Sequence, residues 1–250
     1  MIDTHAHILS EFYDDIDELI EELKSKNIIK VINCADSIET SKEVLNIYNK
    51  YEGYLLPAVG IHPENIDNSN LKTIENIIKE HKVFAIGEIG LDYHYNDENK
   101  DEQKEYFIKQ LDLALKYDLP VIIHIREAMQ ECFDILKTRK NKGIIHCFSG
   151  SVEMAREYIK LGYKLGIGGV LTFKNSKLYE VIEKIDLKDI VLETDSPFLS
   201  PEPFRGKKNK PCNVLYVAKR IAEIKNISLE EVINTTTATA KQILLLLLMI

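Results

Sequence analysis

Residues 83–92 read "VFAIGEIGLD", an apolar run in which only Glu88 and Asp92 carry charge. A short, nearly continuous apolar run between polar stretches is typical of a parallel β-strand that is covered on both faces. An ionised carboxylate inside such a strand is costly unless a partner neutralises it. The run therefore predicts a buried parallel strand, with a cation near Glu88.

Runs of the same kind recur along the whole chain. They occupy residues 1–8, 28–35, 54–63, 83–92, 120–127, 143–150, 163–169 and 190–197. Amphipathic stretches lie between them, such as the one that carries Phe107, Leu111, Ala114 and Leu115 at helical spacing. This alternation predicts an α/β fold, a single (β/α)8 barrel of the TIM type, as one domain over residues 1–250. The alternative is a doubly wound open sheet, which more often carries a G-x-G-x-x-G turn that this sequence lacks.

The composition limits the classes of function. The chain is 45% hydrophobic and 29% charged, which suits a globular protein with a large core. Its formal net charge of −8 makes it a poor general binder of nucleic acid, so a polyanionic substrate must meet a local basic patch or a metal. The four cysteines form no C-x-x-C pair and the N-terminus shows no secretion signal, which together predict a cytoplasmic location without a membrane anchor.

The C-terminal run Ile243–Ile250 is apolar but far shorter than the roughly 20 residues that span a bilayer. We expect it to be the end of a last helix that packs on the body of the protein. A contact between subunits is the alternative.

Histidines and carboxylates gather in the predicted strands or at their ends. Active sites of barrels lie at the carboxyl ends of the strands, so these side chains are expected to meet. Imidazole and carboxylate suit Zn²⁺, Mn²⁺ or Fe²⁺, and six such groups are too many for one catalytic zinc. The sequence therefore predicts two divalent ions, bound by His5, His7, Glu88, His124, His146 and Asp195.

Within this set we expect Glu88 to bridge the two ions. One ion would take His5, His7 and Asp195, and the other His124 and His146. Glu193 shares a strand face with Asp195 and is either a further ligand or a partner of one. His62, in a loop beside Pro63, is expected to be exposed to solvent; the alternative is that it reaches the site.

Several motifs, in order, resemble those of the TatD-family metal-dependent deoxyribonucleases, which are (β/α)8 barrels of the wider metal-dependent hydrolase superfamily. They read "DTHAH", "VGIHP", "AIGEIGLDY", "PVIIHIREA", "HCFSGS", "LETDSP" and "RGKKNKP", and the resemblance runs from Met1 to about Leu244. It implies a divalent-metal phosphodiesterase that acts on DNA, often as a 3′→5′ exonuclease, with the same six residues as metal ligands. The chain departs from the family pattern at Glu64, Lys210 and Thr239, none of which belongs to that set.

The expected mechanism uses a water shared by the two ions, which loses a proton near neutral pH and attacks phosphorus in line. Glu88 and Asp195 are the predicted catalytic carboxylates, with Asp195 as the general base. The basic segment 203–211 follows the last strand, so Arg205 and Lys207 are predicted to bind substrate phosphates. Arg126 is a further phosphate-binding candidate, or else the partner of a structural carboxylate.

The expected partner is DNA as substrate, single-stranded or at 3′ ends, with no obligate protein partner and no membrane. Two other classes of function stay open. The same barrel and ligands support hydrolysis of an amide, a lactone or a related small substrate. A non-enzymatic binding protein would be expected to lack ligands, and none of the six is missing. Residue types alone do not distinguish Zn, Mn and Mg as the physiological metal.

Overall fold

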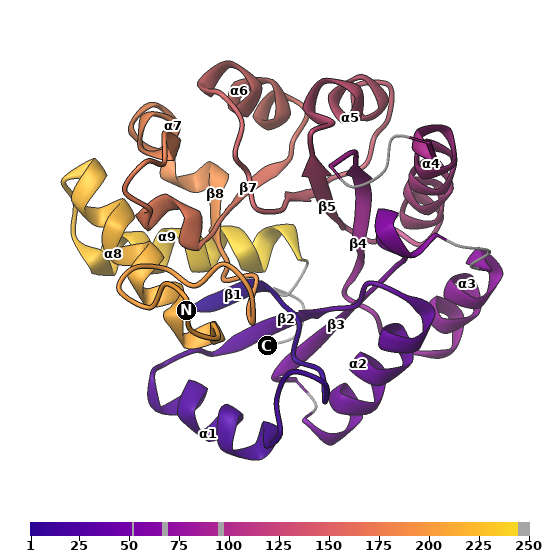
Figure 1. The fold of residues 1–250 in the computed structure, drawn as a ribbon, viewed down its shortest axis with the longest axis horizontal. Coiled ribbons are helices and arrows are strands. Elements are labelled where there is room, and N and C mark those ends of the chain that lie inside the picture. Colours follow the sequence, from indigo (N-terminus) through magenta and orange to yellow (C-terminus); the bar gives the residue numbers. More distant parts are fainter. Residues whose placement is uncertain (52, 67–69, 95–97, 245–250) are drawn as a thin grey trace.

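The computed structural model describes residues 1–51, 53–66, 70–94 and 98–244. Eight parallel strands form one sheet in the order β1 to β8, and helices alternate with them along the chain (Figure 1). The strands are β1 (Ile2–Ala6), β2 (Lys30–Cys34), β3 (Leu55–Val59), β4 (Ala85–Asp92), β5 (Val121–Arg126), β6 (Gly143–Ile145), β7 (Lys164–Ile167) and β8 (Ile190–Leu192). Each lies inside one of the eight apolar runs, so the predicted (β/α)8 barrel is confirmed.

The helices surround the sheet and cover the outer faces of the strands (Figure 1). They are α1 (Ile16–Ser25), α2 (Ile38–Lys50), α3 (Leu71–Glu80), α4 (Lys100–Lys116), α5 (Met129–Leu136), α6 (Val152–Lys160), α7 (Leu178–Lys184), α8 (Val214–Lys225) and α9 (Leu229–Ile243). Four short 3₁₀ turns are described as well, at η1 (Pro63–Asn65), η2 (Gly169–Thr172), η3 (Leu187–Asp189) and η4 (Pro211–Asn213). Polar residues precede many of the helices. The side chains of Ser37, before α2, and Ser228, before α9, accept hydrogen bonds from backbone N–H groups of the first turn.

Hydrogen bonds between β1 and the segment after β8 close the barrel. The buried Asp3 accepts bonds from the backbone and the hydroxyl of Thr194, at 3.0 and 2.5 Å. The backbone N–H of His7 donates to Ser196, and that of Asp195 donates to His5. The two ends of the sheet are therefore tied at the point where the candidate site residues lie.

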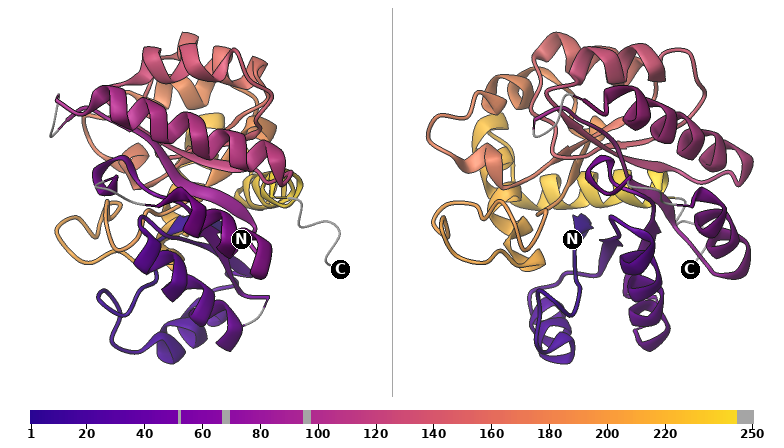
Figure 2. Two further views of the ribbon diagram at one scale, coloured as in Figure 1. Left: turned by 90° about the vertical axis from the view of Figure 1, so that its right-hand side faces the viewer. Right: turned by 45° about the vertical axis from the view of Figure 1, so that its right-hand side comes forward.

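The last helix closes the opposite end of the barrel. Ala240 and Leu244 pack in one buried cluster with residues at the beginning of several strands, among them Ile2, Ile122 and Ile144. Figure 2 shows α9 at the end of the barrel opposite to the loop that follows β8. Full burial of a leucine side chain contributes about 1.5–3 kcal/mol, so this contact stabilises the base of the barrel.

Ile243 packs against the same cluster, as we expected of the apolar C-terminal run. The rest of that run, residues 245–250, lies outside the described residues. Among the helices of the described ranges, none is long and apolar enough to cross a membrane.

Candidate metal centre

The structure brings all six predicted ligands together at the carboxyl end of the barrel. His5, Glu88 and His124 belong to β1, β4 and β5, and the other three lie in the first residues after a strand. The six residues are His5, His7, Glu88, His124, His146 and Asp195. At most 19% of any of their side chains is exposed.

Glu88 lies at the middle of the cluster, and its two oxygens face different histidines. Oε2 is 3.3 Å from Nε2 of His5 and 3.5 Å from Nε2 of His7. Oε1 is 2.9 Å from Nδ1 of His124 and 3.7 Å from Nε2 of His146. Burial would raise the pKa of Glu88, but His5 and His146 hold it well below its ordinary value. Glu88 is therefore an ionised carboxylate shared by two sets of imidazoles.

The first set lies on the β1 side of Glu88. Nε2 of His5 and Nε2 of His7 are 3.1 Å apart. Nδ1 of His7 lies 3.0 Å from the backbone oxygen of Cys34, which can only accept a hydrogen bond. A neutral His7 therefore carries its proton on Nδ1 and turns the lone pair of Nε2 toward the centre.

His146 belongs to this same side, where its ring stacks on that of His5 with the centroids 3.5 Å apart. Its Nδ1 is 3.0 Å from Oε1 of Glu193, so its Nε2 faces the centre. Burial alone would lower the pKa of His146, but Glu193 and Glu88 raise it to about 10. Gly166 makes room for Glu193, since a Cβ at this position would come within 2.1 Å of Oε2. Glu193 thus orients a candidate ligand from outside the centre.

The second set lies on the β4 side. Nε2 of His124 is 2.9 Å from Oδ2 of Asp92, and its Nδ1 faces Glu88. Burial would lower the pKa of His124, but hydrogen bonds with Asp92 and Glu88 raise it to about 9. Asp92 was not among the predicted residues. The sequence did carry a signal for it: Asp92 follows Glu88 by an even number of residues along one strand, which puts both carboxylates on the same face.

The prediction that His62 is exposed to solvent was wrong. Only 9% of His62 is exposed, and its ring lies 4.4 Å from that of His124 between centroids. The backbone N–H of His62 donates to Asp36, which turns the chain inward after β3. Nδ1 accepts from the backbone N–H of Glu64, so the neutral ring carries its proton on Nε2, 3.8 Å from Oε1 of Glu88. Burial lowers the pKa of His62 to about 4, so the ring is neutral at pH 7.

The predicted division of the ligands between the two ions stays a prediction, because His146 lies between the two sets. Its Nε2 is 3.7 Å from Oε1 of Glu88, the oxygen that also faces His124. His146 stacks on His5 and is 6.4 Å from His124 between ring centroids, whereas His62 takes the place beside His124. Sequence order could not reveal this, because the distance between residues of different strands depends on the curvature of the barrel.

Asp195 completes the β1 side. Its Oδ1 lies 3.5–3.7 Å from Nε2 of three histidines, namely His5, His7 and His146. Burial would raise the pKa of Asp195, but the hydrogen bond from His7 and the nearby imidazoles lower it. The carboxylate is ionised at neutral pH and open to the cavity above it.

A cavity of about 630 Å³ lies over the centre and is lined by Arg126, Glu64 and Phe198 besides the cluster itself. Phe198 is 49% exposed, and its ring meets that of His7 edge to face. Arg205 and Lys207 are exposed on the loop after β8, and neither is among the residues that line this cavity. Of the three predicted phosphate contacts, only Arg126 therefore lines the cavity over the centre.

The chemistry of these donors fits a divalent cation. Two imidazole lone pairs that converge at 3.1 Å repel each other unless a proton or a cation lies between them. The same holds for an imidazole lone pair that faces a carboxylate oxygen. His5, His7 and Glu88 form one candidate group, His5, His146 and Asp195 a second, and His62, Glu88 and His124 a third. Imidazole and carboxylate are the ligands of zinc and manganese, and Asp92 and Glu193 hold the histidines as outer carboxylates commonly do at metal sites.

An eight-stranded parallel barrel with such a cluster at its carboxyl end defines a metal-dependent hydrolase of the TIM-barrel type. The family model described as TatD related DNase matches residues 2–245. The chain belongs to this family, as the sequence motifs predicted.

Relatives agree with this assignment over nearly the whole chain. An uncharacterized metal-dependent hydrolase of Bacillus subtilis, YabD, is 41% identical, with 97% of this chain and 98% of that protein covered. The human deoxyribonuclease TATDN3 is 32% identical, with 96% and 93% covered. The crystal structure of YJJV, a TatD homologue of Escherichia coli, is 30% identical, covers 97% of both chains and superimposes with a TM-score of 0.91.

Proposed function

We propose that the protein is a deoxyribonuclease that binds two divalent ions and shortens DNA from the 3′ end. The observation that carries the proposal is the position of Glu88, whose oxygens face imidazoles on two sides 3.3 and 2.9 Å away. A carboxylate in this position suits a bridge between two cations. The human relative is named a deoxyribonuclease, which supports DNA as the substrate.

The six predicted residues would hold the two ions. His5, His7, His146 and Asp195 serve the β1 side, His124 serves the β4 side, and Glu88 serves both. When bound, the cations would supply a water of lowered pKa and positive charge for the phosphate oxygens. The residue types suit Zn²⁺ or Mn²⁺ and accept Mg²⁺, so all three are candidates.

The residues of the chain supply the rest of the reaction. Asp195 is ionised and opens to the cavity, so its carboxylate accepts a proton from the attacking water. Arg126 lines the same cavity and offers a planar guanidinium to a phosphate. His62 is neutral with its proton on Nε2, so in this form it offers a hydrogen bond to a phosphate oxygen.

The location that we propose is the cytoplasm. All four cysteines are free thiols, and three of them are buried, which suits a reducing compartment.

The test is cleavage of single-stranded DNA by protein that is stripped of metal and then given Mg²⁺, Mn²⁺ or Zn²⁺. A 5′-labelled strand should become a ladder that shortens from the 3′ end, while a covalently closed circular strand stays intact. The His5→Ala/His7→Ala variant should abolish the ladder. A His81→Ala variant is the matched control, since His81 lies exposed at the end of α3.

Failure of this proposal has a clear form. If the loaded enzyme binds metal but leaves linear DNA intact, and instead hydrolyses an amide or a lactone, then the substrate is wrong although the centre is right. Cleavage of the circular strand would overturn the exonuclease assignment alone. An RNA strand of the same sequence, run in parallel, decides between the two nucleic acids.

A further inference from the structure

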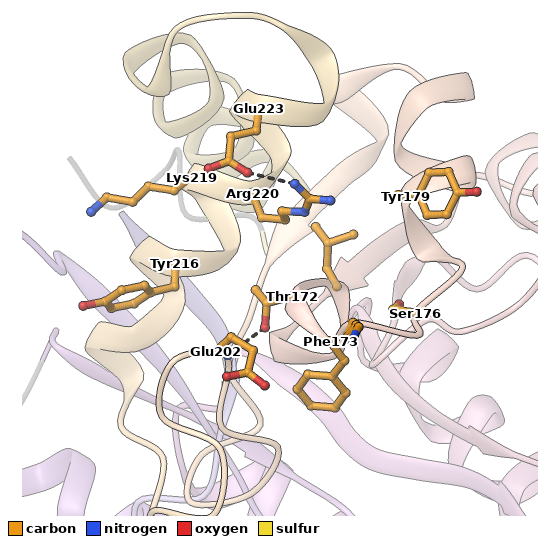
Figure 3. Close-up of a pocket in the computed structure, with 11 residues that line it drawn as sticks. Thr172, Phe173, Ser176, Tyr179, Glu202, Tyr216, Lys219, Arg220 and Glu223 are labelled. Carbon is orange, nitrogen blue, oxygen red and sulfur yellow. Dashed lines mark hydrogen bonds and ion pairs between the residues drawn. The ribbon is translucent and has the colours of Figure 1, made fainter.

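A second cavity, of about 600 Å³, lies outside the metal centre, between η2, α7, α8 and the loop after β8. Figure 3 shows Arg220 extending from α8 toward the side that carries Tyr179, with the ring of Phe173 at another edge. Tyr179 is 47% exposed, and so offers an aromatic face to a ligand. No residue of this cavity belongs to the cluster around Glu88.

The two cavities share two walls. In η2, Val170 lines the cavity over the metal centre, whereas Leu171 and Thr172 line the second cavity. In the loop after β8, Leu199 lines the first and Glu202 the second. The backbone N–H of Glu202 donates to the hydroxyl of Thr172 at 2.9 Å, which ties the two walls together. A long polymeric substrate that leaves the metal centre across either wall therefore arrives at the second cavity.

Two residues of the basic segment 203–211, Phe204 and Arg205, contact residues that line this second cavity. The guanidinium carbon of Arg205 lies 3.7 Å from the centre of the Phe173 ring. The ring of Phe204 meets that of Tyr216 edge to face, with the centroids 5.0 Å apart. Phe173 and Tyr216 both line the cavity. Of the positive charges that the sequence predicted near the metal centre, Arg205 thus lies beside this neighbouring site.

The charges of the cavity suit a polyanion. Lys174, Lys219 and Arg220 line it, and Arg205 adjoins it. The opposing carboxylates are Glu202 and Glu223, of which Glu223 pairs with Arg220 at 2.9 Å. The local balance is positive, although the whole chain carries −8. Cations beside an exposed aromatic ring, here that of Tyr179, are a combination that binds single-stranded nucleic acid.

We propose that this second cavity binds the DNA strand on the 5′ side of the cleaved bond, with phosphates on Lys219 and Arg220 and a base on Tyr179. This rests on the proposed function, because it gives that substrate a second region of binding. Because the two cavities share walls, a DNA strand that continues from the metal centre is favoured as the occupant over a separate protein partner. The site would favour long strands over dinucleotides.

The experiment compares a dinucleotide with a strand of about ten nucleotides, a length within the usual range for a single binding fold. The Lys219→Gln/Arg220→Gln variant removes two cations from α8. The control Lys79→Gln/Lys109→Gln removes two from α3 and α4, and it also breaks ion pairs along a helix. Tyr179→Ala tests base stacking by itself.

Two readouts are needed: kcat/KM for both substrates, and binding of a cleavage-resistant phosphorothioate strand to the metal-loaded protein. In the α8 variant, we expect binding and kcat/KM of the long strand to fall about tenfold, with the dinucleotide unchanged. The slope of log affinity against log salt should fall by about one for each phosphate that the variant no longer binds. Tyr179→Ala should weaken binding by about tenfold, and the α3/α4 control should match the wild type.

The outcomes separate this proposal from the proposed function. If the wild type cleaves the dinucleotide but the α8 variant handles the long strand normally, the second cavity does not bind DNA and the nuclease stands. If the wild type cleaves nothing, but the α8 variant loses strand binding, the cavity stands and the nuclease falls. A wild type that neither binds nor cleaves overturns both.

Discussion

The two sides of the candidate metal centre are held in place by different means. On the β1 side, His7 is oriented by a backbone oxygen, and the backbone N–H of Asp195 is tied to β1. On the β4 side, His124 is oriented by a carboxylate at one nitrogen and faces Glu88 with the other. The β1 side therefore depends on closure of the barrel as well as on the carboxylate of Glu193, which faces His146, whereas the β4 side depends on charge alone. Glu88 is the residue common to both.

Glu88→Gln should have the largest effect, because it removes the charge that both sides share. The variant is expected to lose both ions and to reduce kcat about 10⁴-fold, the upper range for loss of one catalytic group. Metal content by mass spectrometry and turnover on single-stranded DNA are the measurements. A variant that keeps one full equivalent of metal would show that Glu88 serves only one side.

Asp195→Asn should reduce kcat about 10³-fold, because the amide cannot accept a proton from the attacking water. The fold should persist, since the backbone N–H that ties residue 195 to His5 is unchanged. Turnover at saturating metal and the melting temperature test this together. Wild-type turnover under these conditions would rule out Asp195 as the base.

Asp92→Asn and Glu193→Gln form a matched pair, one on each side of the centre. Each removes a carboxylate that orients a histidine, so each should weaken metal affinity about 10–100-fold. We expect Asp92→Asn to lose the ion of the β4 side and Glu193→Gln that of the β1 side. Metal titrations of both variants measure this. If both lose the same ion, the two sides are not independent.

Metal binding should also depend on pH. The pKa values of His124 and His146 are raised to about 9 and about 10 in the metal-free protein, so both rings are protonated at pH 7. Metal binding should therefore release about two protons at pH 7, and affinity should rise until about pH 10. Calorimetry in buffers with different ionisation enthalpies counts the protons. Release of none would mean that these rings are already neutral.

The same pKa shifts make the stability of the metal-free protein depend on pH. Both pKa values are above the value of about 6.5 expected in the unfolded chain. The stabilisation from these two histidines is complete below about pH 6.5 and is lost as pH rises through about 9 and about 10. Melting temperatures between about pH 6.5 and about pH 10 should fall for metal-free protein. The loaded protein should show a smaller change.

The sequence was sufficient where the signal is local. Each of the eight apolar runs contains a strand, because burial on both faces of a parallel sheet demands such a run. The polar residues inside those strands or directly after them had to meet, because the carboxyl ends of all strands in a barrel share one face. For that reason the six candidate ligands could be predicted as one group.

Only the tertiary structure decided how these groups are shared. It turns His62 inward through a bond to Asp36, pairs Asp92 with His124, and stacks His146 on His5. It also sets Arg205 against Phe173 beside a second cavity. These interactions join residues that are distant in sequence, so they depend on barrel curvature and on the paths of loops. Strand periodicity determines which face a side chain occupies, but the closed barrel determines its neighbours.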